Sequence, residues 1–199
     1  MIETERFAKQ MEFIAEIDKL KHVVRQSKLT DCSRQENDSE HSWHIATMAL
    51  VLSEYSNELE ISLLKVIKML LIHDLVEIDA GDTFLYDEEG NSDRDKREKE
   101  AAARIFGLLP IDQAKELTEI WEEFEAMSTA EAKFARALDH LQPLILSYHN
   151  KGWSWKTHKV VKSQILESKE PMKEGSKELW EYAKTLLLRA VEDGFLVDE

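Results

Sequence analysis

The chain has little of what disulfide-rich, strand-rich or membrane-spanning proteins need. Its 199 residues include one cysteine, three prolines and six glycines. A single cysteine, Cys32, excludes an internal disulfide and favours a reducing, cytoplasmic setting. The shortage of glycine and proline leaves few tight turns and favours long helices. No apolar run approaches the roughly 20 residues of a membrane-spanning helix, because two lysines interrupt the most apolar stretch, LLKVIKMLLI.

The charge of the chain is strongly of one sign. Lysine and arginine number 26, aspartate and glutamate number 40, and the formal net charge is −14. This charge argues against non-specific binding to nucleic acid and to anionic membrane surfaces, so we expect neither among the partners. If the substrate is itself an anion, cations must be gathered locally at its binding site.

The apolar residues follow the spacing of helices. They recur every three or four positions over most of the chain, as in the stretch HIATMALVL. No segment shows a convincing alternation with a period of two, which is the pattern of a half-buried strand. We therefore predict one all-α domain over residues 1–199, with about seven or eight helices. The expected loops are Lys28–Asp38, Asp79–Gly90 and Ser168–Gly175, the first two of which flank an unusual polar cluster.

That cluster lies in the segment LLIHDLVEIDAGD, which joins an apolar run to a group of titratable side chains. A surface helix would not need His73 there, and a core helix would not tolerate Asp74 and Glu77. Adjacent side chains on a helix diverge by about 100°, so His73 and Asp74 can share an ion only if it lies between them. An imidazole with a carboxylate suits Mn, Fe, Co or Zn. Taken alone, the adjacent pair is equally compatible with an ion pair on the surface.

Glu77 follows on the same face of this helix. It lies four residues after His73 and three after Asp74, a spacing that brings side chains together. A carboxylate at that place beside a metal is suited to hold or move a proton of a water molecule.

Two further segments carry candidates for the same site. ENDSEHSWHIATMAL places His41 at the start of a helix and His44 one turn later. FARALDHLQPLILSY places Asp139 within an apolar helix, where an unpaired carboxylate is costly. That carboxylate either binds a metal or forms a buried pair with Arg136 or His140.

A histidine, a later His-Asp pair and a distant aspartate, in this order, resemble the pattern of the HD-domain metal-dependent phosphohydrolases. The segments SRQENDSEHSWHIA, LLIHDLVEIDAGDTF and AKFARALDHLQPL resemble the bacterial branch that lies near the 5′-deoxynucleotidases. The resemblance runs from DKLKHVVRQ to the final helix. It implies an all-α fold, a divalent metal ion (Mn, Co, Fe, Zn or Mg) and a small phosphate ester as substrate.

Carried over residue by residue, the resemblance implies a metal centre with two acid-base side chains. The implied metal ligands are His41, His73, Asp74 and Asp139. Glu77 matches the family's catalytic glutamate in the segment HDLVE. Asp82 matches the aspartate of the following Gly-Asp pair, which is implicated in proton transfer.

The resemblance also implies cationic side chains on the substrate's side. Arg34, seven residues before His41, matches an arginine there, and Lys21 and Arg25 are weaker matches. The 5′-deoxynucleotidases have an Arg-Trp pair near the end of the first helix that contacts the substrate. This chain has VVRQS at that place and no tryptophan, which leaves the choice of nucleotide open.

Together these residues predict hydrolysis of a phosphomonoester, most simply a (deoxy)nucleoside 5′-monophosphate. The metal would lower the pKa of a water molecule and offset charge on phosphorus. Glu77 would orient or deprotonate that water, and Asp82 would give a proton to the leaving oxygen. Arg34, with Arg25 and Lys21, would bind the phosphate against the acidic background. Proteins that look similar are commonly dimers, so a homodimer is a further expectation.

Other interpretations keep the site but change its use. The substrate could be a phosphodiester, a pyrophosphate or a nucleoside triphosphate, or the metal could be structural within a non-catalytic helical interaction module. A ferritin-like oxidase and an HExxH protease do not fit, because no histidine follows a glutamate by three residues and the HExxH motif is absent.

Four other polar or aromatic residues remain unassigned. Trp43 fits packing in the core better than stacking on a base, and His44 fits a packing or supporting role. Lys96 and Arg97 fit a solvated helix start better than a contact with phosphate.

Overall fold

Helices make up nearly all of the regular structure in this computed structural model, which describes residues 4–83 and 92–199. The α-helices are, in chain order, α1 (Glu5–Glu16), α2 (Asp38–Leu52), α3 (Leu63–Ile72), α4 (Glu77–Ala80), α6 (Arg94–Phe106), α7 (Ile111–Ala126), α8 (Ala130–His149), α9 (Trp153–His158), α10 (Lys162–Lys169), α11 (Met172–Gly175) and α12 (Lys177–Glu192). Three 3₁₀ helices join them: η1 (Ile17–His22), η2 (Ser53–Tyr55) and η3 (His73–Val76). The predicted all-α fold is therefore confirmed.

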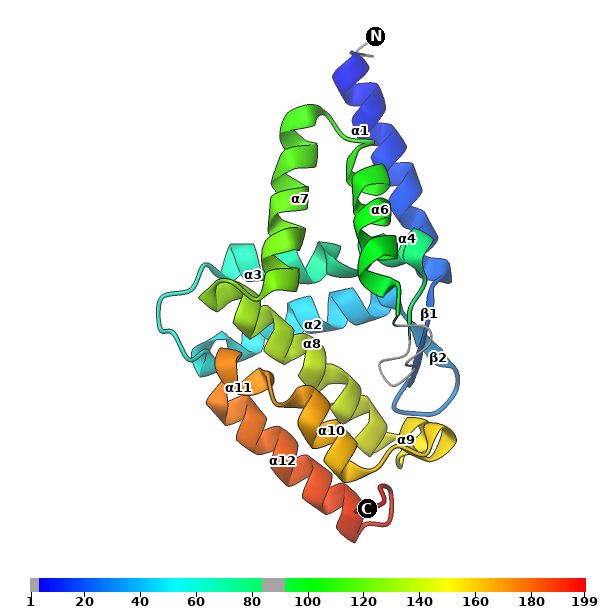
Figure 1. The fold of residues 1–199 in the computed structure, drawn as a ribbon, viewed down its shortest axis with the longest axis vertical. Helices are drawn as coiled ribbons and strands as arrows, with labels where there is room; N and C mark the ends of the chain where they lie inside the picture. Colours follow the sequence, from blue (N-terminus) through cyan, green and yellow to red (C-terminus); the bar gives the residue numbers. More distant parts are fainter. Residues whose placement is uncertain (1–3, 84–91) are drawn as a thin grey trace.

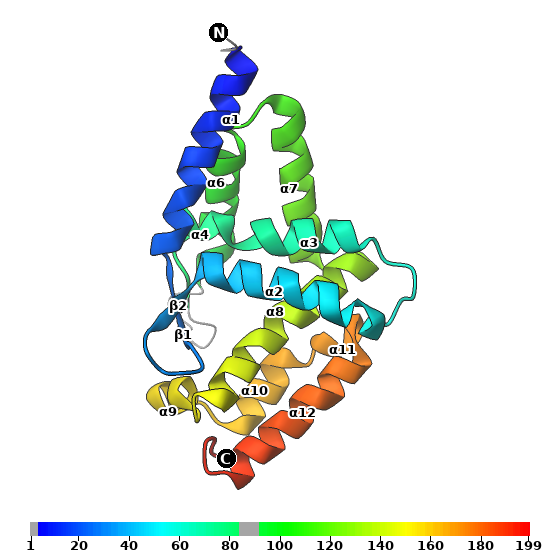
Figure 2. The same cartoon turned by 180° about the vertical axis from the view of Figure 1, so that it is seen from behind.

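The helices are spread along the long axis of the molecule (Figure 1). α1, α6 and α7 stand together at the N-terminal end, and α2 and α3 cross below them (Figures 1 and 2). α8 runs obliquely from there towards α9, with α11 and α12 packed against it and α10 beside α12. None of the described helices is long and apolar enough to cross a membrane.

The buried apolar side chains form two clusters. The larger joins α2, α3 and α8 to the helices that come after α8, and the smaller joins α1 and α6. α7 contributes to both clusters, with Ile120 and Phe124 in the larger and Trp121 in the smaller. The chain passes from one cluster to the other around η3, because Leu70 belongs to the larger and Leu75 to the smaller. His73 and Asp74 therefore lie at the junction of two packed units.

A short antiparallel hairpin departs from the purely helical prediction. β1 (Val24–Lys28) pairs with β2 (Gln35–Asn37) within or next to the predicted loop Lys28–Asp38. The sequence does not reveal this pairing, because the strands have five and three residues and β1 shows no alternation of buried and exposed positions. The hairpin carries Arg25 on β1 and Glu36 on β2, and both side chains reach the polar cluster around His73 and Asp74.

The two other predicted loops contain or border short helices. Asp79–Gly90 begins inside α4, and its residues after Thr83 lie outside the described part of the chain. Ser168–Gly175 contains α11. A four-residue helix makes barely one turn, so the sequence carries no period by which to recognise it.

Local hydrogen bonds fix the start of α2. The side chain of Asn37 accepts from the backbone N–H of Glu40, and the carboxylate of Glu40 accepts from the backbone N–H of Asn37. This capping box sets where the first turn begins. As a result His41 lies on the inner face of the helix, with none of its surface exposed.

We expect Phe134→Ala to destabilise the protein strongly, because Phe134 lies on α8 in the larger cluster with none of its surface exposed. Truncating a buried phenylalanine costs about 3–5 kcal/mol, which lowers Tm by about 6–20 °C in a chain of this size. Thermal unfolding followed by circular dichroism measures the shift.

Leu59→Ala is the control for this substitution. Leu59 is 96% exposed, so its truncation should move Tm by no more than about 2 °C. An equally small shift for Phe134→Ala would contradict the assignment of Phe134 to the core.

Candidate metal centre

His73 and Asp74 lie next to each other in η3, directly after α3. Both are almost completely buried, with 4% and 7% of their surfaces exposed. Nδ1 of His73 lies 3.0 Å from the backbone oxygen of Leu70. Because a carbonyl oxygen can only accept, Nδ1 carries the proton of the neutral ring, and the lone pair of Nε2 faces inwards. Nε2 lies 2.9 Å from Oδ1 of Asp74.

Two other helices bring a histidine and an aspartate to the same place. Nε2 of His41, on α2, lies 3.0 Å from Oδ1 of Asp139, on α8. The same Asp139 oxygen lies 3.8 Å from Nε2 of His73, and Nε2 of His41 lies 3.9 Å from Oδ2 of Asp74. Ligand atoms of His41, His73 and Asp139 are all within 4.8 Å of one another. The structure thus brings together all four side chains that were expected to hold a metal.

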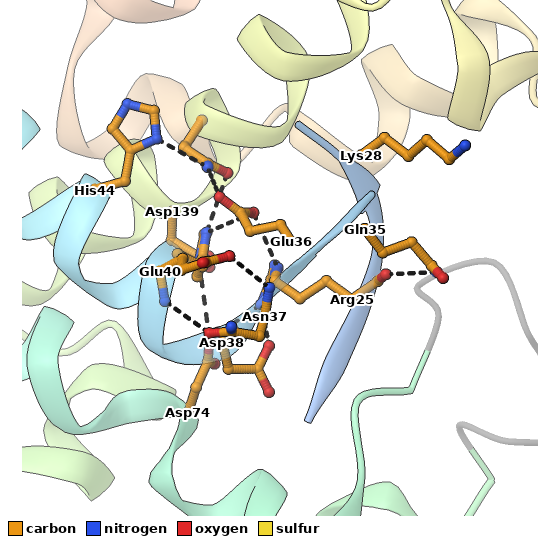
Figure 3. Close-up of polar contacts among 12 residues, drawn as sticks. Arg25, Lys28, Gln35, Glu36, Asn37, Asp38, Glu40, His44, Asp74 and Asp139 are labelled. Carbon is orange, nitrogen blue, oxygen red and sulfur yellow. Dashed lines mark hydrogen bonds and ion pairs between the residues drawn. The ribbon is translucent and has the colours of Figure 1, made fainter. Parts of the chain in front are cut away.

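A buried network behind His41 fixes how its ring is turned. Two members of this network, Glu36 and His44, are labelled in Figure 3. Nδ1 of His41 lies 3.0 Å from Oε1 of Gln142, which is completely buried. The amide nitrogen of Gln142 donates to Oε1 of Glu36 at 2.7 Å and lies 3.1 Å from Nδ1 of His44. These two acceptors orient the amide, so its oxygen accepts from Nδ1–H of His41. The lone pair of Nε2 is then left facing Asp139.

Sequence reasoning misses Gln142 and Glu36. Gln142 follows Asp139 by three residues, which puts both on one face of α8, and this spacing is the available signal. Glu36 precedes the residue that caps α2 and reaches Gln142 only through the fold, so no local pattern marks it.

A second group of acids adjoins the first. Carboxylate oxygens of Asp38, Asp74 and Glu77 lie within 4.8 Å of one another. Arg25 lies among them, with Nη1 3.2 Å from Oδ1 of Asp38 and 3.1 Å from Oδ2 of Asp74 (Figure 3). Sequence reasoning also misses Asp38, because an acid at the first position of a helix is ordinary there.

Burial and mutual repulsion favour protonation of the acids around Arg25. Burial, followed by the charges of Asp74 and Asp38, raises the pKa of Glu77 well above its usual range. Burial and Asp74 also raise the pKa of Asp38 to about 7. The pKa of Asp82 is raised by burial and by Asp74, against the opposing charge of Arg25.

Three of the four candidate ligands are instead shifted towards their charged forms. Burial opposes the charge of His73, but Asp74 and Asp139 outweigh it and raise the pKa of the ring to about 10. Burial alone would raise the pKa values of Asp74 and Asp139, but the neighbouring imidazoles outweigh it and lower both. Without a metal, a proton on His73 therefore helps to balance these carboxylates, together with Arg25, 3.1 Å from Asp74, and Arg136, 3.5 Å from Asp139. A metal ion must displace that proton, so metal affinity should fall as the pH falls.

Several buried polar atoms of this cluster have no hydrogen-bond partner within the described part of the chain. They are Oε2 of Glu77, Oδ2 of Asp38, Oε2 of Glu36 and Nε of Arg25. A buried polar atom left in this way costs about 1–3 kcal/mol. Imidazole nitrogens and carboxylate oxygens are suitable donors for Mn²⁺, Fe²⁺, Co²⁺ and Zn²⁺. The residues present therefore fit a divalent metal ion.

Comparison with known proteins identifies the family. The family model described as "HD domain" matches residues 17–180, a range that includes all four candidate ligands. The chain belongs to the HD-domain family. The resemblance seen in its sequence is therefore confirmed.

The HD-domain relatives include a curated human protein and solved structures. Human 5′-deoxynucleotidase HDDC2 is 33% identical over 136 residues, which cover 68% of this chain and 65% of the human protein, just under two thirds of its length. A crystal structure from Magnetospirillum magnetotacticum MS-1, described as a predicted metal-dependent phosphohydrolase, is 52% identical with a TM-score of 0.93. That match covers 99% of this chain and 100% of the other. The names of these two proteins, a 5′-deoxynucleotidase and a predicted metal-dependent phosphohydrolase, agree with the enzyme class expected from the sequence.

A more distant structure shares the fold alone. The conserved hypothetical protein from Pyrococcus furiosus is 22% identical, with a TM-score of 0.65 over 92% of this chain and 99% of its own.

Three cationic side chains were expected to contact the substrate. Of these, only Arg25 lies in the polar cluster around His73 and Asp74. Its side chain is 14% exposed. Arg34 is 54% exposed, and its guanidinium forms a two-point pair with Glu40 at 2.5 and 2.8 Å. Lys21 is 63% exposed and pairs with Asp18. Substrate binding by Arg34 or Lys21 stays a prediction.

The structure also shows the surroundings of Trp43, Lys96 and Arg97, whose roles the sequence left open. Trp43 is 66% exposed, so the expectation that it packs in the core is wrong. Lys96 is 79% exposed, as expected for a solvated helix start. Arg97 instead donates to the backbone oxygen of Ala80 and to Oγ1 of Thr83, and so ties α6 to the end of α4.

A cavity of about 170 Å³ opens beside the polar cluster around His73 and Asp74. Its walls include His73, Asp74, Glu77, Asp82 and Asp139. Four cationic side chains also line it: Arg25, Arg94, Arg136 and Lys169. Apolar side chains complete the wall, among them Pro143, Leu144, Trp155, Val160 and Ile165. The cavity thus combines charged and apolar surface, as the binding of an organic phosphate requires.

We expect Gln142→Leu to weaken metal binding by about 10- to 100-fold, because His41 loses the acceptor that orients its ring. Calorimetric titration of the metal-free protein with Mn²⁺ or Co²⁺ measures the affinity. Melting gives a second readout, because metal at 100 times its Kd adds about 2.7 kcal/mol to the folded state, or about 5–11 °C in Tm. The variant should need correspondingly more metal for the same rise.

Gln113→Leu is the matched control for Gln142→Leu. Gln113 bonds Gln10 and lies outside the cluster, so its loss should leave metal affinity unchanged. The Tm of the metal-free variants separates lost affinity from lost folding. Unchanged metal affinity in Gln142→Leu would contradict the positioning of His41 by Gln142.

Proposed function

We propose that the chain is a metal-dependent phosphohydrolase that releases phosphate from (deoxy)nucleoside 5′-monophosphates. The observation that carries this proposal is Glu77, a buried carboxylate with one oxygen unpartnered among the described residues, beside a cluster of metal-type donors in one cavity. The names of the curated relatives, 5′-deoxynucleotidases, support the same class of substrate.

Four side chains would hold the metal ion: His41, His73, Asp74 and Asp139. When bound, a divalent ion withdraws charge from a phosphoryl oxygen and lowers the pKa of a water molecule. The two imidazoles need not reorient for this task, because the backbone of Leu70 and the amide of Gln142 already hold their Nδ1 atoms. Such preorganisation is what makes electrostatic stabilisation of a transition state effective.

Glu77 acts as the general base. Its carboxylate shares the cavity with the candidate ligands, and it is 6% exposed. The raised pKa of Glu77 means that, once ionised, it binds a proton strongly. Asp38 lies within 4.8 Å and contributes a hydrogen bond that raises this pKa, so the two carboxyl groups form a proton-holding pair.

Asp82 and Arg25 act on the phosphate ester itself. Burial and Asp74 raise the pKa of Asp82, so it keeps a proton more readily than an ordinary aspartate and can give it to the leaving 5′ oxygen. Arg25 has a buried Nε with no hydrogen-bond partner among the described residues, although Oε2 of Glu36 lies 3.7 Å away, and a guanidinium is well shaped to hold a phosphate oxygen.

A substrate panel tests the proposal. The full chain is loaded with Mn²⁺, Co²⁺ or Mg²⁺, and phosphate release is measured from deoxynucleoside and nucleoside 5′-monophosphates, a phosphodiester, pyrophosphate and a nucleoside triphosphate. We expect the highest kcat/KM with a 5′-monophosphate. No release from any monophosphate by folded, metal-loaded protein would contradict the proposal, and faster turnover of another phosphate would reassign the substrate.

We expect Glu77→Gln to keep metal affinity and lose about 10²- to 10⁴-fold in kcat, because the amide cannot accept the proton of the attacking water. Steady-state kinetics and calorimetric metal titration measure the two effects. Glu125→Gln is the control, since Glu125 lines the same cavity but pairs with Arg136. Its kcat should stay within about 10-fold of wild type, and full turnover by Glu77→Gln would exclude Glu77 as the base.

A further inference from the structure

The cationic side chains of the cavity differ in whether an acid already neutralises them. Nε of Arg94 lies 2.6 Å from Oε1 of Glu98. Arg136 lies 3.0 Å from Glu125. These two guanidinium groups are therefore paired with carboxylates of the protein. The guanidinium group of Arg25 is likewise paired with Asp38 and Asp74.

Lys169 is the exception. It is the last residue of α10, it is half-buried, and it lines the cavity together with His73 and Asp139. Within residues 4–83 and 92–199 its ammonium group has no hydrogen bond and no acid within 4.0 Å. Burial lowers its pKa to about 8, with Asp139 opposing the shift, so the group still carries charge at neutral pH.

A half-buried charge without a counter-charge is costly, and a bound anion would remove that cost. Among the charged groups that influence the ammonium group of Lys169, Asp139 is the acid with the largest effect. Lys169 and Asp139 also line the same cavity. A charged lysine repels a metal ion, so its expected ligand there is an anion rather than the cation.

We infer that Lys169 binds a non-bridging oxygen of the substrate's reacting phosphate. This inference rests on the proposed function, because it takes the cavity to be the phosphate site. Arg25 reaches the same cavity from β1 and Lys169 from α10, so two separate elements would hold the phosphate. A protein of net charge −14 needs such local cations to attract an anion.

The test compares Lys169→Met, Lys169→Arg and a matched control, Lys173→Met. Lys173 is exposed and pairs with Glu170, so its loss removes the same charge from outside the cavity. Calorimetry with the Mn²⁺-loaded full chain gives the Kd of inorganic phosphate. Kinetics give kcat and KM for the best 5′-monophosphate, and inhibition by the matching nucleoside, which lacks the phosphate, gives its Ki.

For Lys169→Met we expect phosphate affinity to fall, and KM to rise, by about 10- to 100-fold, the loss of one charge-assisted hydrogen bond. The Ki of the nucleoside should stay within about 3-fold, since no phosphate is present. Lys169→Arg should recover most of the phosphate affinity, and Lys173→Met should match wild type. If Lys169→Met does not fold, Lys169→Gln serves in its place.

Unchanged phosphate affinity in Lys169→Met would overturn the inference. Equal losses for phosphate and nucleoside would overturn it too, because they would mean that Lys169 only shapes the cavity. A loss seen with pyrophosphate but not with inorganic phosphate would move the contact to a second phosphate and so reject the role of Lys169 at the reacting phosphate. The phosphate-binding measurement needs no turnover, so it decides the role of Lys169 even if no monophosphate is hydrolysed.

Discussion

The rest of the structure depends on one constraint: carboxylates buried at the junction of two cores must be balanced by positive charge. Asp38, Asp74 and Glu77 lie within a few ångströms of one another, and the protein itself offers them chiefly Arg25 and a protonated His73. Removing charge from water in this way is expensive unless partners are fixed in place. Protons on His73, Glu77 and Asp38 offset this charge when no metal is bound, because burial and neighbouring charges raise the pKa values of all three groups. A bound cation would take the place of such protons, so the geometry of the site points to chemistry rather than to stability.

Packing supplies the rigidity that this balance requires. α3 and α8 are anchored in the larger apolar cluster, so Asp139 and the end of α3 cannot drift apart without opening a packed core. The hairpin adds Arg25 and Glu36 from the side, and Glu36 holds Gln142 against His41. The polar network is therefore fixed by apolar contacts made elsewhere, and the ligands are oriented before any ion arrives.

Features encoded by neighbouring residues could be predicted, and features created by distant contacts could not. The all-α fold follows from apolar spacing, and the resemblance to HD domains drew attention to His73 and Asp74, which lie where the chain passes between cores. Glu36 and Lys169 carry no local signal, because each acquires its surroundings from an element far away in the sequence. The exposed Trp43 shows the same limit, since an aromatic residue in a helix does not reveal which face is covered.

The junction also divides the residues of the site between the two apolar clusters. His41 and Asp139 lie on helices of the larger cluster, whereas Asp79, two residues after Glu77, is held at 2.7 Å by Arg104 of α6. α7 joins the two sides, because Phe124 belongs to the larger cluster and Trp121 to the smaller. The metal-type donors and the acids beside them are therefore supported from two directions by one connected core, and a change in the packing on either side would reach the same few atoms.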